Sequence, residues 1–568
     1  MRKPNLPWTM AGYAALTILL TYPLAFRLTR LMLDAGAGED AYIFVWNIWW
    51  LKKALLGLQT SPYITDFIFY PDGVNLALHT FPLPGTLLGM ILSFFRPGLE
   101  GLFVGYNLVI LVSFFLSALG TYLLVHKLTG SRSAAFVSGL VYAFTYYRFC
   151  NTVRLHALET AVLPFCAWAL VGMVEEKKVW WGVLVGIFAA ATLYSSKEYF
   201  AFLLAGILLA IIYHSVRNPR RIWTRRMLWP KLAAAGCFIV SALPLLAAMS
   251  SHGLGGGARA TAHAVVFSAD FLDFLVPNPR HPLFGSWSSV IEEGFHGGSG
   301  GFGMSVPLVA VILSIWAFVT GDRQKTWPWA GLGIFFFLYC LGPVIRLGGF
   351  HTQIPSLYAG LTATVPWIEI SRTPMRAVVG VHLVTAILVG YALAPTPGGS
   401  SRRRLAAAVA GALLVFETLS LPLKMTPVEV HPYYHQLAAT PAEGAVLELP
   451  PKDRASLLHQ TVHERKIAAV RRVYPRSPDR SLTFWRSDGF GDFLDTLFRP
   501  ERTDGLTDAS RALLASKHRR MLMGYGFRFV TVDKLEIPPE ELQHTLSVLR
   551  EMAPERVFED ENLAAFEF

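Results

Sequence analysis

The sequence predicts an α-helical polytopic membrane protein followed by a soluble C-terminal α/β domain. Hydrophobic residues make up 53% of the 568 residues, and the mean hydropathy is +0.42. Charged residues make up only 16%, whereas soluble proteins contain about a quarter. The charge changes near residue 424, because residues 424–568 contain 20 basic and 22 acidic residues, and the net charge of +11 arises entirely before them. We therefore predict a membrane domain over 1–423 and a soluble domain over 424–568.

Eleven stretches are apolar and long enough to be predicted as membrane spans. Several contain only about 16 residues, fewer than the ~20 that a helix needs to cross a bilayer, so their ends must extend into the flanks. A further apolar stretch at 84–95 is too short to span at about 1.5 Å per residue, and a span hidden beside it would raise the total to thirteen. The eleven predicted spans lie near 8–26, 103–126, 133–148, 158–174, 179–194, 198–213, 230–249, 304–320, 327–345, 376–395 and 405–423.

Basic residues between the predicted spans set the orientation. One loop contains Arg217, Arg220, Arg221, Arg225, Arg226 and Lys231 and no acidic residue. Cytoplasmic loops of membrane proteins are enriched in Lys and Arg, so this loop is predicted to be cytoplasmic. Counting spans outward then gives a cytoplasmic N-terminus and an extracytoplasmic C-terminal domain. The positive charge is explained by membrane orientation and requires no nucleic-acid partner.

This orientation leaves three long loops on the outer face, at 27–102, 251–303 and 346–375. Loops of this length without clear secondary structure are uncommon unless they have a function. Within the first loop, 42–58 and 84–95 are predicted to be helices along the membrane surface, since Trp and Tyr favour the headgroup layer. We expect the functional site on this outer face.

The acidic pair Glu39 and Asp40 opens the first outer loop, directly before a run that contains three tryptophans. Carboxylates this close to a bilayer are costly, which favours a functional role. We predict that Asp40 is a catalytic general base at the membrane–water boundary, with Glu39 as a second carboxylate or metal ligand. The simpler alternative is that Asp40 only caps the helix that follows it.

Basic side chains also occur on the predicted outer face, against their usual preference for the cytoplasmic side. A bound phosphate would explain them, because a guanidinium presents a planar fork of donors to phosphate oxygens. Simpler alternatives exist: the arginines near residue 150 suit the membrane interface, and Lys197 suits an ion pair with Glu198. The predicted substrate-binding residues are Arg148, Arg154, His156, Lys197, Arg372 and Arg376.

After residue 424 the pattern becomes that of a soluble α/β domain. Residues 444–450 and 527–532 are predicted to be strands, each bounded by a proline or glycine. Residues 509–525 have helical periodicity, and 538–551 begin with prolines that favour a helix start. The sequence of this domain shows no catalytic cluster, so we predict that it acts as a lid or handles the acceptor.

The residues after Asp40 resemble a known family. Asp40-Ala41-Tyr42-x-Phe44-x-Trp46-Asn47 resembles the first-loop signature of bacterial GT-C glycosyltransferases, and 117–124 and 128–132 are also similar to them. That superfamily includes protein O-mannosyltransferases, oligosaccharyltransferases and aminoarabinose transferases. The resemblance implies a sugar donor carried on a polyprenyl phosphate, an active site on the outer face and a location in the bacterial inner membrane.

The predicted reaction moves a sugar from a polyprenyl-phosphate donor to a glycan, lipid or protein acceptor. It needs a base for the acceptor hydroxyl and positive charge for the leaving phosphate. A divalent metal, Mg²⁺ or Mn²⁺, at Glu39 and Asp40 stays open, because the chain has this pair in place of an Asp-x-Asp motif. Two other functions stay open: a transporter or flippase of lipid-linked sugars, and an O-antigen ligase or polymerase that uses the same class of donor.

Overall fold

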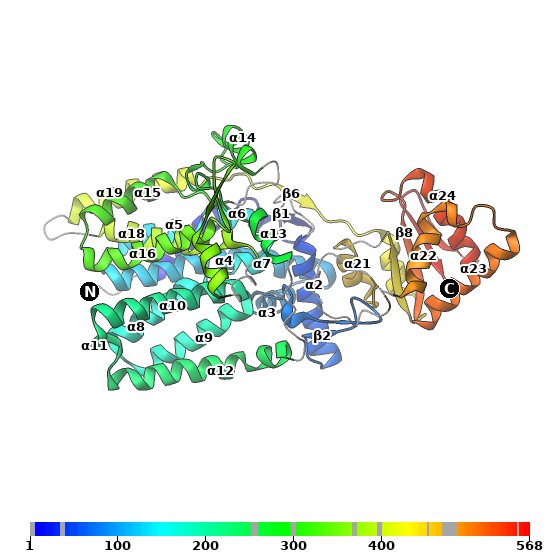
Figure 1. Cartoon of the computed structure of the whole chain (residues 1–568), viewed down its shortest axis with the longest axis horizontal. Coiled ribbons are helices and arrows are strands. Elements are labelled where there is room, and N and C mark those ends of the chain that lie inside the picture. Colours follow the sequence, from blue (N-terminus) through cyan, green and yellow to red (C-terminus); the bar gives the residue numbers. More distant parts are fainter. Residues whose placement is uncertain are drawn as a thin grey trace.

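A bundle of long helices forms one side of the molecule, and a smaller part with a β-sheet forms the other (Figure 1). The two parts meet where helix α2 (Asp40–Lys52) lies beside helix α21 (Ala455–His463). The computed structural model describes residues 6–33, 40–250, 259–296, 303–365, 372–394, 400–450, 454–468, 484, 487–553 and 556–568.

A helix forms at each of the eleven predicted spans. Apolar segments of this length fold as helices because every backbone N–H and C=O can then be paired within the segment. These helices are α1 (Leu6–Leu20), α4 (Gly98–Thr129), α5 (Arg132–Ala143), α8 (Val162–Glu176), α9 (Val179–Ser195), α10 (Lys197–Arg217), α12 (Leu228–Ser250), α15 (Leu308–Thr320), α16 (Arg323–Cys340), α18 (Val378–Leu393) and α19 (Ser400–Glu417).

Not all of these helices are long enough to cross a membrane by themselves. Within the described residues, length and composition identify five candidate spans: Gly98–Thr129, Leu155–Glu176, Lys197–Arg217, Arg225–Ser250 and Pro374–Leu393. Shorter apolar helices, such as α1 and α9, have 10–17 residues. The structure therefore supports a multi-pass membrane protein, whereas eleven or thirteen crossings remain a prediction.

Two glycines allow α9 and α12 to pack at close range. A Cβ at Gly182 would lie 2.0 Å from the carbonyl oxygen of Pro230, and one at Gly186 would lie 2.5 Å from that of Ala234. Residues four apart share one face of a helix, so both glycines face α12. Any larger side chain at these positions would force the two helices apart.

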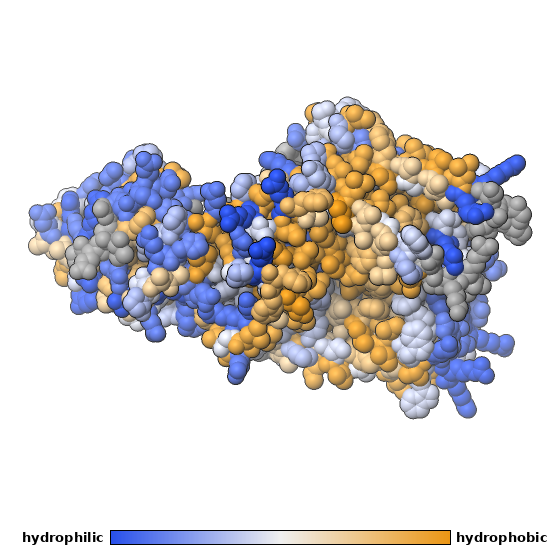
Figure 2. Space-filling model, turned by 180° about the vertical axis from the view of Figure 1, so that it is seen from behind, coloured by the Kyte–Doolittle hydropathy of each residue, from blue (hydrophilic) through white to orange (hydrophobic). Residues whose placement is uncertain are grey.

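Hydrophobic residues cover the middle of the molecule and hydrophilic residues its two ends (Figure 2). The short helix α11 (Pro219–Ile222) contains Arg220 and Arg221, and the 3₁₀ turn η4 (Arg225–Met227) follows it. Helix α11 lies at the end of the bundle opposite to the C-terminal part (Figure 1). The basic loop and the C-terminal part are thus separated by an apolar band, as the charge argument requires. Which end faces the cytoplasm remains a prediction.

The first predicted outer loop is folded into the protein. Trp46, Trp49 and Trp50 in α2 are only 0%, 5% and 1% exposed, and Trp46 stacks on Trp50 with ring centroids 5.9 Å apart. These tryptophans therefore pack inside the protein rather than anchoring in headgroups, since an apolar face that suits headgroups also suits a protein core; the position of α2 along the membrane surface remains a prediction. The 3₁₀ turn η1 (Leu24–Phe26) precedes the loop, which also contains η2 (Lys53–Leu58), β2 (Ile64–Thr65), β3 (Val74–Asn75), η3 (Leu76–Leu78) and α3 (Leu83–Ser93).

The other predicted outer segments contain short helices and a hairpin. Asp270 fixes the hairpin turn, because its carboxylate accepts the N–H groups of Gly348 and Gly349 at 2.9 and 2.8 Å. Both glycines have positive φ angles, which the turn requires. The elements are α6 (Tyr146–Cys150), α7 (Leu155–Leu158), α13 (Arg259–Val266), η5 (Asp273–Leu275), α14 (Gly285–His296), β4 (Val344–Leu347), β5 (Phe350–Pro355), α17 (Leu357–Thr364) and η7 (Pro374–Ala377).

The C-terminal part is built on a four-stranded sheet of order β7-β8-β10-β9. β7 pairs in parallel with β8, and the other neighbours are antiparallel. A separate pairing joins β1 (Leu31–Leu33) to β6 (Met425–Pro427), so the start of the tail is held against the first loop. The remaining elements are α20 (Pro432–Ala439), β7 (Ala445–Leu449), α22 (Asp488–Phe498), η8 (Pro500–Arg502), α23 (Asp508–Gly524), β8 (Phe527–Asp533), α24 (Pro539–Met552), β9 (Arg556–Glu559) and β10 (Leu563–Glu567).

Candidate functional site

Asp40 is the first residue of α2, the helix between the bundle and the C-terminal part (Figure 1). Its side chain is 15% exposed. Arg154 Nε lies 2.7 Å from Asp40 Oδ2, and Arg454 Nη2 lies 2.9 Å from Asp40 Oδ1. Each carboxylate oxygen is thus bonded to a different guanidinium, one from the bundle and one from the C-terminal part. The positive end of the α2 dipole also favours a negative charge at this position.

Arg154 reaches Asp40 from the short segment between α6 and α7. Its neighbours Val153 and Leu155 are both fully buried, and its own N–H donates to the carbonyl of Asn151 at 2.9 Å. Burial on either side leaves the Arg154 side chain pointing away from the core, where it is 33% exposed. The local fold therefore presents this arginine to the start of α2.

Arg148, the other predicted arginine of this segment, is turned into the core. It is 1% exposed, and it donates to the carbonyl of Leu158 at 2.8 Å and to Ser113 Oγ at 3.1 Å. Its guanidinium also lies over the ring of Phe114, 4.9 Å from the centroid. These contacts tie α6 to α4 and α7, so we leave Arg148 out of the proposed phosphate site.

His156 lies beside the same helix as Asp40. Its ring stacks on that of Phe44, with the centroids 5.6 Å apart. Phe44 follows Asp40 by four residues, about one turn of α2. The structure therefore brings together three of the residues that the sequence singled out: Asp40, Arg154 and His156.

A second group forms around Glu198 at the start of α10. Arg376 is bonded to the Glu198 carboxylate, and Thr373 Oγ1 donates to both of its oxygens at 2.9 Å. The Glu198 and Arg376 side chains are 13% and 19% exposed, so this pair is largely shielded from water. The simpler expectation that Glu198 pairs with Lys197 is wrong.

The remaining predicted basic residues flank this second group. Lys197 Nζ donates to the carbonyl of His79 at 3.4 Å, and Arg372 is half-buried next to Thr373. Between the two groups, the buried Tyr147 hydroxyl lies 2.9 Å from that of Tyr199, which follows Glu198 in α10.

The position of Glu39 lies outside the described residues. Within the described part of the chain, no three His, Cys, Asp or Glu side chains are grouped so that they could hold a metal ion. The described neighbours that bond Asp40 are cations rather than further acidic ligands. A Mg²⁺ or Mn²⁺ ion at Glu39 and Asp40 therefore remains a prediction.

Sequence reasoning missed Arg454. This residue directly precedes α21, which packs lengthwise along α2. Trp46 Nε1 donates to Gln460 Oε1 at 2.6 Å, and Lys53 Nζ lies 2.6 Å from Glu464. Contacts therefore run in the same order along both helices, beginning with Asp40 and Arg454. The only signal in the sequence is a charged stretch, Lys452-Asp453-Arg454, placed directly after a predicted strand.

The opposite side of α21 is held by the sheet. Glu448 of β7 is 4% exposed, and it accepts a hydrogen bond from Ser456 Oγ at 2.7 Å and contacts His459 Nδ1 at 3.1 Å. Burial alone would raise the pKa of Glu448, but the charge and hydrogen bonds of His459 and Ser456 outweigh it and hold the pKa below its usual value. The sheet thus fixes α21, and α21 fixes the position of Arg454.

Most of the helical bundle matches a known family of proteins. A family model described as "Domain of unknown function (DUF6311)" matches residues 56–416. The chain belongs to this family. The matched region begins after Asp40 and ends before Arg454, so the match itself gives no role to either residue. A search of the curated proteins finds no match to this chain.

Three solved structures are similar to this chain. The arabinofuranosyltransferase AftD from mycobacteria aligns with 100% of this chain and 40% of its own, with 14% identity and a TM-score of 0.54. An Archaeoglobus fulgidus oligosaccharyltransferase aligns with 92% of this chain and 68% of its own, with 12% identity and a TM-score of 0.44. ArnT from Cupriavidus metallidurans aligns over 99% and 97%, with 13% identity and a TM-score of 0.41.

The likeness to AftD concerns the fold, because the identity is low and this chain spans only 40% of the AftD chain. At the level of the fold, the resemblance to a glycosyltransferase indicated by the sequence is confirmed.

Proposed function

We propose that this protein is a membrane glycosyltransferase that moves a sugar from a polyprenyl-phosphate donor to an acceptor hydroxyl. The observation that carries the proposal is Asp40, held between two guanidinium groups at the end of an apolar bundle. The GT-C fold and the neighbour AftD, an arabinofuranosyltransferase by name, support sugar transfer. The acceptor class (glycan, lipid or protein) is left open by this geometry.

The proposed chemistry uses the opposite charges of the site. Asp40 accepts the proton of the acceptor hydroxyl as that oxygen attacks the anomeric carbon. The bond between the sugar and the phosphate oxygen breaks, and the electron pair leaves with the phosphate. The leaving phosphate gains negative charge, which Arg154 and Arg454 are placed to stabilise.

The reaction is proposed to occur on the extracytoplasmic face. The basic loop 217–231 and the C-terminal part lie at opposite ends of the molecule (Figure 1), and such basic loops favour the cytoplasm. Asp40 would then face the outside with the C-terminal part. A reporter fused after Lys424 should be active only outside the cytoplasm, and a cytoplasmic signal would exclude this orientation.

The decisive test is Asp40→Asn, which keeps the shape of the side chain and removes its negative charge. General-base catalysis contributes about 10²–10⁴-fold, so transfer from a radiolabelled polyprenyl-phosphate sugar by purified protein should fall by that factor. Asp495→Asn is the matched control, because Asp495 is also bonded to two arginines but lies in the C-terminal part. Both variants should elute as single species in detergent.

Near-normal turnover by Asp40→Asn would remove the general-base role. A metal site at Glu39 and Asp40 predicts a different pattern, in which Glu39→Gln and chelation both abolish turnover. Transport remains the second candidate, because Glu159 is 8% exposed inside the candidate span Leu155–Glu176 and accepts a hydrogen bond from Ser195 Oγ at 2.8 Å. Movement of lipid-linked sugar across vesicles without any transfer would favour that function.

A further inference from the structure

The triad of Asp40, Arg154 and Arg454 suggests how the two halves of the reaction are coupled. We propose that Arg454 passes from Asp40 to the leaving phosphate when Asp40 takes the acceptor proton. This inference rests on the proposed glycosyl transfer. It makes the C-terminal part a component of the active site rather than a separate lid.

The first support is the way Arg454 reaches the site. Its only described partner is Asp40, at 2.9 Å, and its side chain is 32% exposed. Asp40 itself is 15% exposed. An anion arriving from the solvent side can therefore contact Arg454 while it is still paired with Asp40.

The second support is unused hydrogen-bonding capacity. A guanidinium has five N–H donors, and Arg154 and Arg454 use one nitrogen each toward Asp40. Among the described residues, neither side chain makes another hydrogen bond. Both groups can therefore bind phosphate oxygens without first breaking a contact with the rest of the protein.

The third support is the balance of charge through the reaction. Before transfer, one carboxylate and two guanidiniums give the triad a net charge of +1. During transfer the acceptor proton moves to Asp40, so the triad becomes +2. In the same step the sugar–oxygen bond breaks, and the phosphate changes from a diester with one negative charge to a monoester with two.

These two changes compensate each other in one place. A neutral carboxyl group no longer holds a guanidinium as an ion pair, so protonation of Asp40 releases Arg454 just as the phosphate gains charge. The rigid attachment of α21 to α2 and to the sheet keeps Arg454 within reach while its side chain changes partner. The negative charge of Asp40 would otherwise oppose the build-up of charge on the phosphate.

The test uses binding, so that it does not depend on turnover. Asp40→Asn imitates the protonated carboxyl and should free both guanidiniums. Purified Asp40→Asn should therefore bind farnesyl monophosphate at least about tenfold more tightly than the unmodified protein, as expected for charge-assisted hydrogen bonds. In a protein that also carries Arg454→Ala, Asp40→Asn should lose most of this gain in affinity. With Arg454→Lys in place of Arg454→Ala, Asp40→Asn should recover only part of the gain.

The control is Glu464→Gln, which removes the ion pair between Glu464, directly after α21, and Lys53, directly after α2, but leaves Arg454 in place. It should show the same tenfold gain upon Asp40→Asn. An equal gain with and without Arg454 would overturn the proposal, since removal of a negative charge alone would then account for it. If Asp40→Asn retained turnover but the binding cycle behaved as expected, the general-base role would fail and the phosphate role of Arg454 would stand.

Discussion

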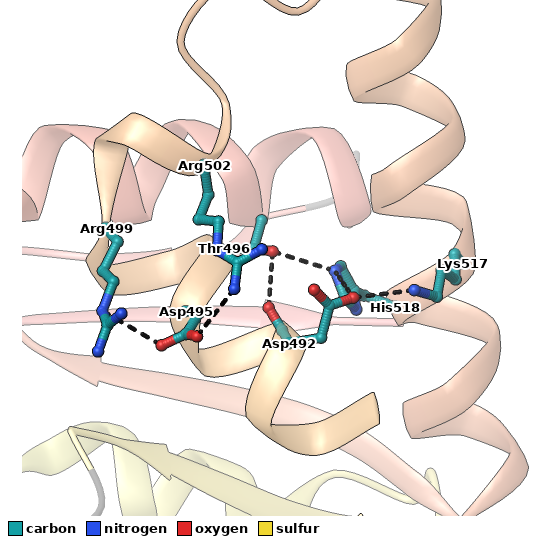
Figure 3. A network of polar contacts seen from close by, with 7 residues as sticks. All are labelled: Asp492, Asp495, Thr496, Arg499, Arg502, Lys517 and His518. Atoms are coloured by element: carbon teal, nitrogen blue, oxygen red, sulfur yellow. Dashed lines mark hydrogen bonds and ion pairs between the residues drawn. The ribbon is translucent and has the colours of Figure 1, made fainter. Parts of the chain in front are cut away.

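Asp40 and Asp495 are each bonded to two arginines, yet the two groups are built in opposite ways. Asp495 is paired with Arg499 and Arg502 at 3.2 and 3.3 Å, four and seven residues further along the chain (Figure 3). The two partners of Asp40 come from distant segments, Arg154 in the bundle and Arg454 in the C-terminal part. The arginines at Asp495 are 65% and 55% exposed, whereas those at Asp40 are 33% and 32% exposed.

The difference shows which ion pairs need the tertiary structure. Arg499 directly follows α22 and lies four residues after Asp495, so the two can pair once the end of this helix has formed, without help from distant parts of the chain. Water surrounds that group and weakens each pair. The two arginines at Asp40 meet there only after the bundle and the C-terminal part have packed together. The fold therefore brings the charges of Arg154 and Arg454 to Asp40 from distant segments of the chain.

The largest expected difference between the two groups is in activity. Arg154→Ala removes a donor from the proposed phosphate site and should lower kcat/KM for the polyprenyl-phosphate donor by about 10²-fold or more. Arg499→Ala, the matched variant at Asp495, should change it by less than about twofold, because a solvated pair contributes little. Initial rates of sugar transfer by the two purified variants measure this contrast.

Equal effects of the two substitutions would contradict the comparison. Arg154→Lys serves as the conservative variant, since it keeps the charge but loses the planar fork of donors. It should recover part of the lost activity. A loss that Arg154→Lys does not relieve at all, together with aggregation of Arg154→Ala, would instead indicate a structural role.

Much of the fold could be predicted because membrane helices leave a strong local signal. Apolar runs marked every helix of the bundle, and proline and glycine marked the strands β7 and β8. The same local signal was insufficient for α2. Trp46, Trp49 and Trp50 suit both a headgroup layer and a protein core, and only the contact with α21 decides between them.

The site could be predicted only where one residue carried the signal by itself. Asp40 stood out because a carboxylate beside an apolar segment is costly. Arg148 and Arg154 were indistinguishable in the sequence, since only the packing of α6 and α7 turns one inward and the other outward. Arg454 gave no comparable signal, because its partner lies at the other end of the chain and is reached through the docking of α21.

An effect of intermediate size is expected when acid lowers the stability of the protein around α21. Arg454 directly precedes this helix, and His463 is its last residue. His463 is 4% exposed, and burial lowers its pKa to about 3. The unfolded chain binds a proton at this histidine below about pH 6.5, whereas the folded protein does not. The contribution to stability is therefore complete above pH 6.5 and is lost as the pH falls toward 3. Between pH 7 and pH 5 the loss is about 2 kcal/mol.

Thermal unfolding followed by tryptophan fluorescence can measure this loss, since Trp46 is bonded to α21. The Tm should fall between pH 7 and pH 5, and His463→Gln should reduce that dependence; the remainder includes His518, whose pKa is also lowered by burial. Glu448 does not confuse the result, because its pKa is lowered and its own contribution is lost only at more acidic pH. An unchanged pH dependence in His463→Gln would show that another group controls acid stability.

The smallest effect on stability is expected at Asp495, where the comparison can be tested by removing the exposed ion pairs. Arg499→Ala combined with Arg502→Ala removes both partners of a carboxylate that is 33% exposed. Exposed pairs of this kind contribute about 0.3–0.5 kcal/mol each, so the double variant should lose less than about 1 kcal/mol of stability. Raising the salt concentration should weaken the native ion pairs, because the charges are in contact with solvent. The difference in stability between the unmodified protein and the double variant should therefore become smaller. Chemical unfolding at low and high salt measures both quantities. A loss of several kcal/mol that salt does not reduce would contradict this expectation. The ion pairs of Asp495 would then depend on tertiary packing as much as those of Asp40. The contrast between ion pairs formed locally and ion pairs formed between distant segments would not hold for this molecule.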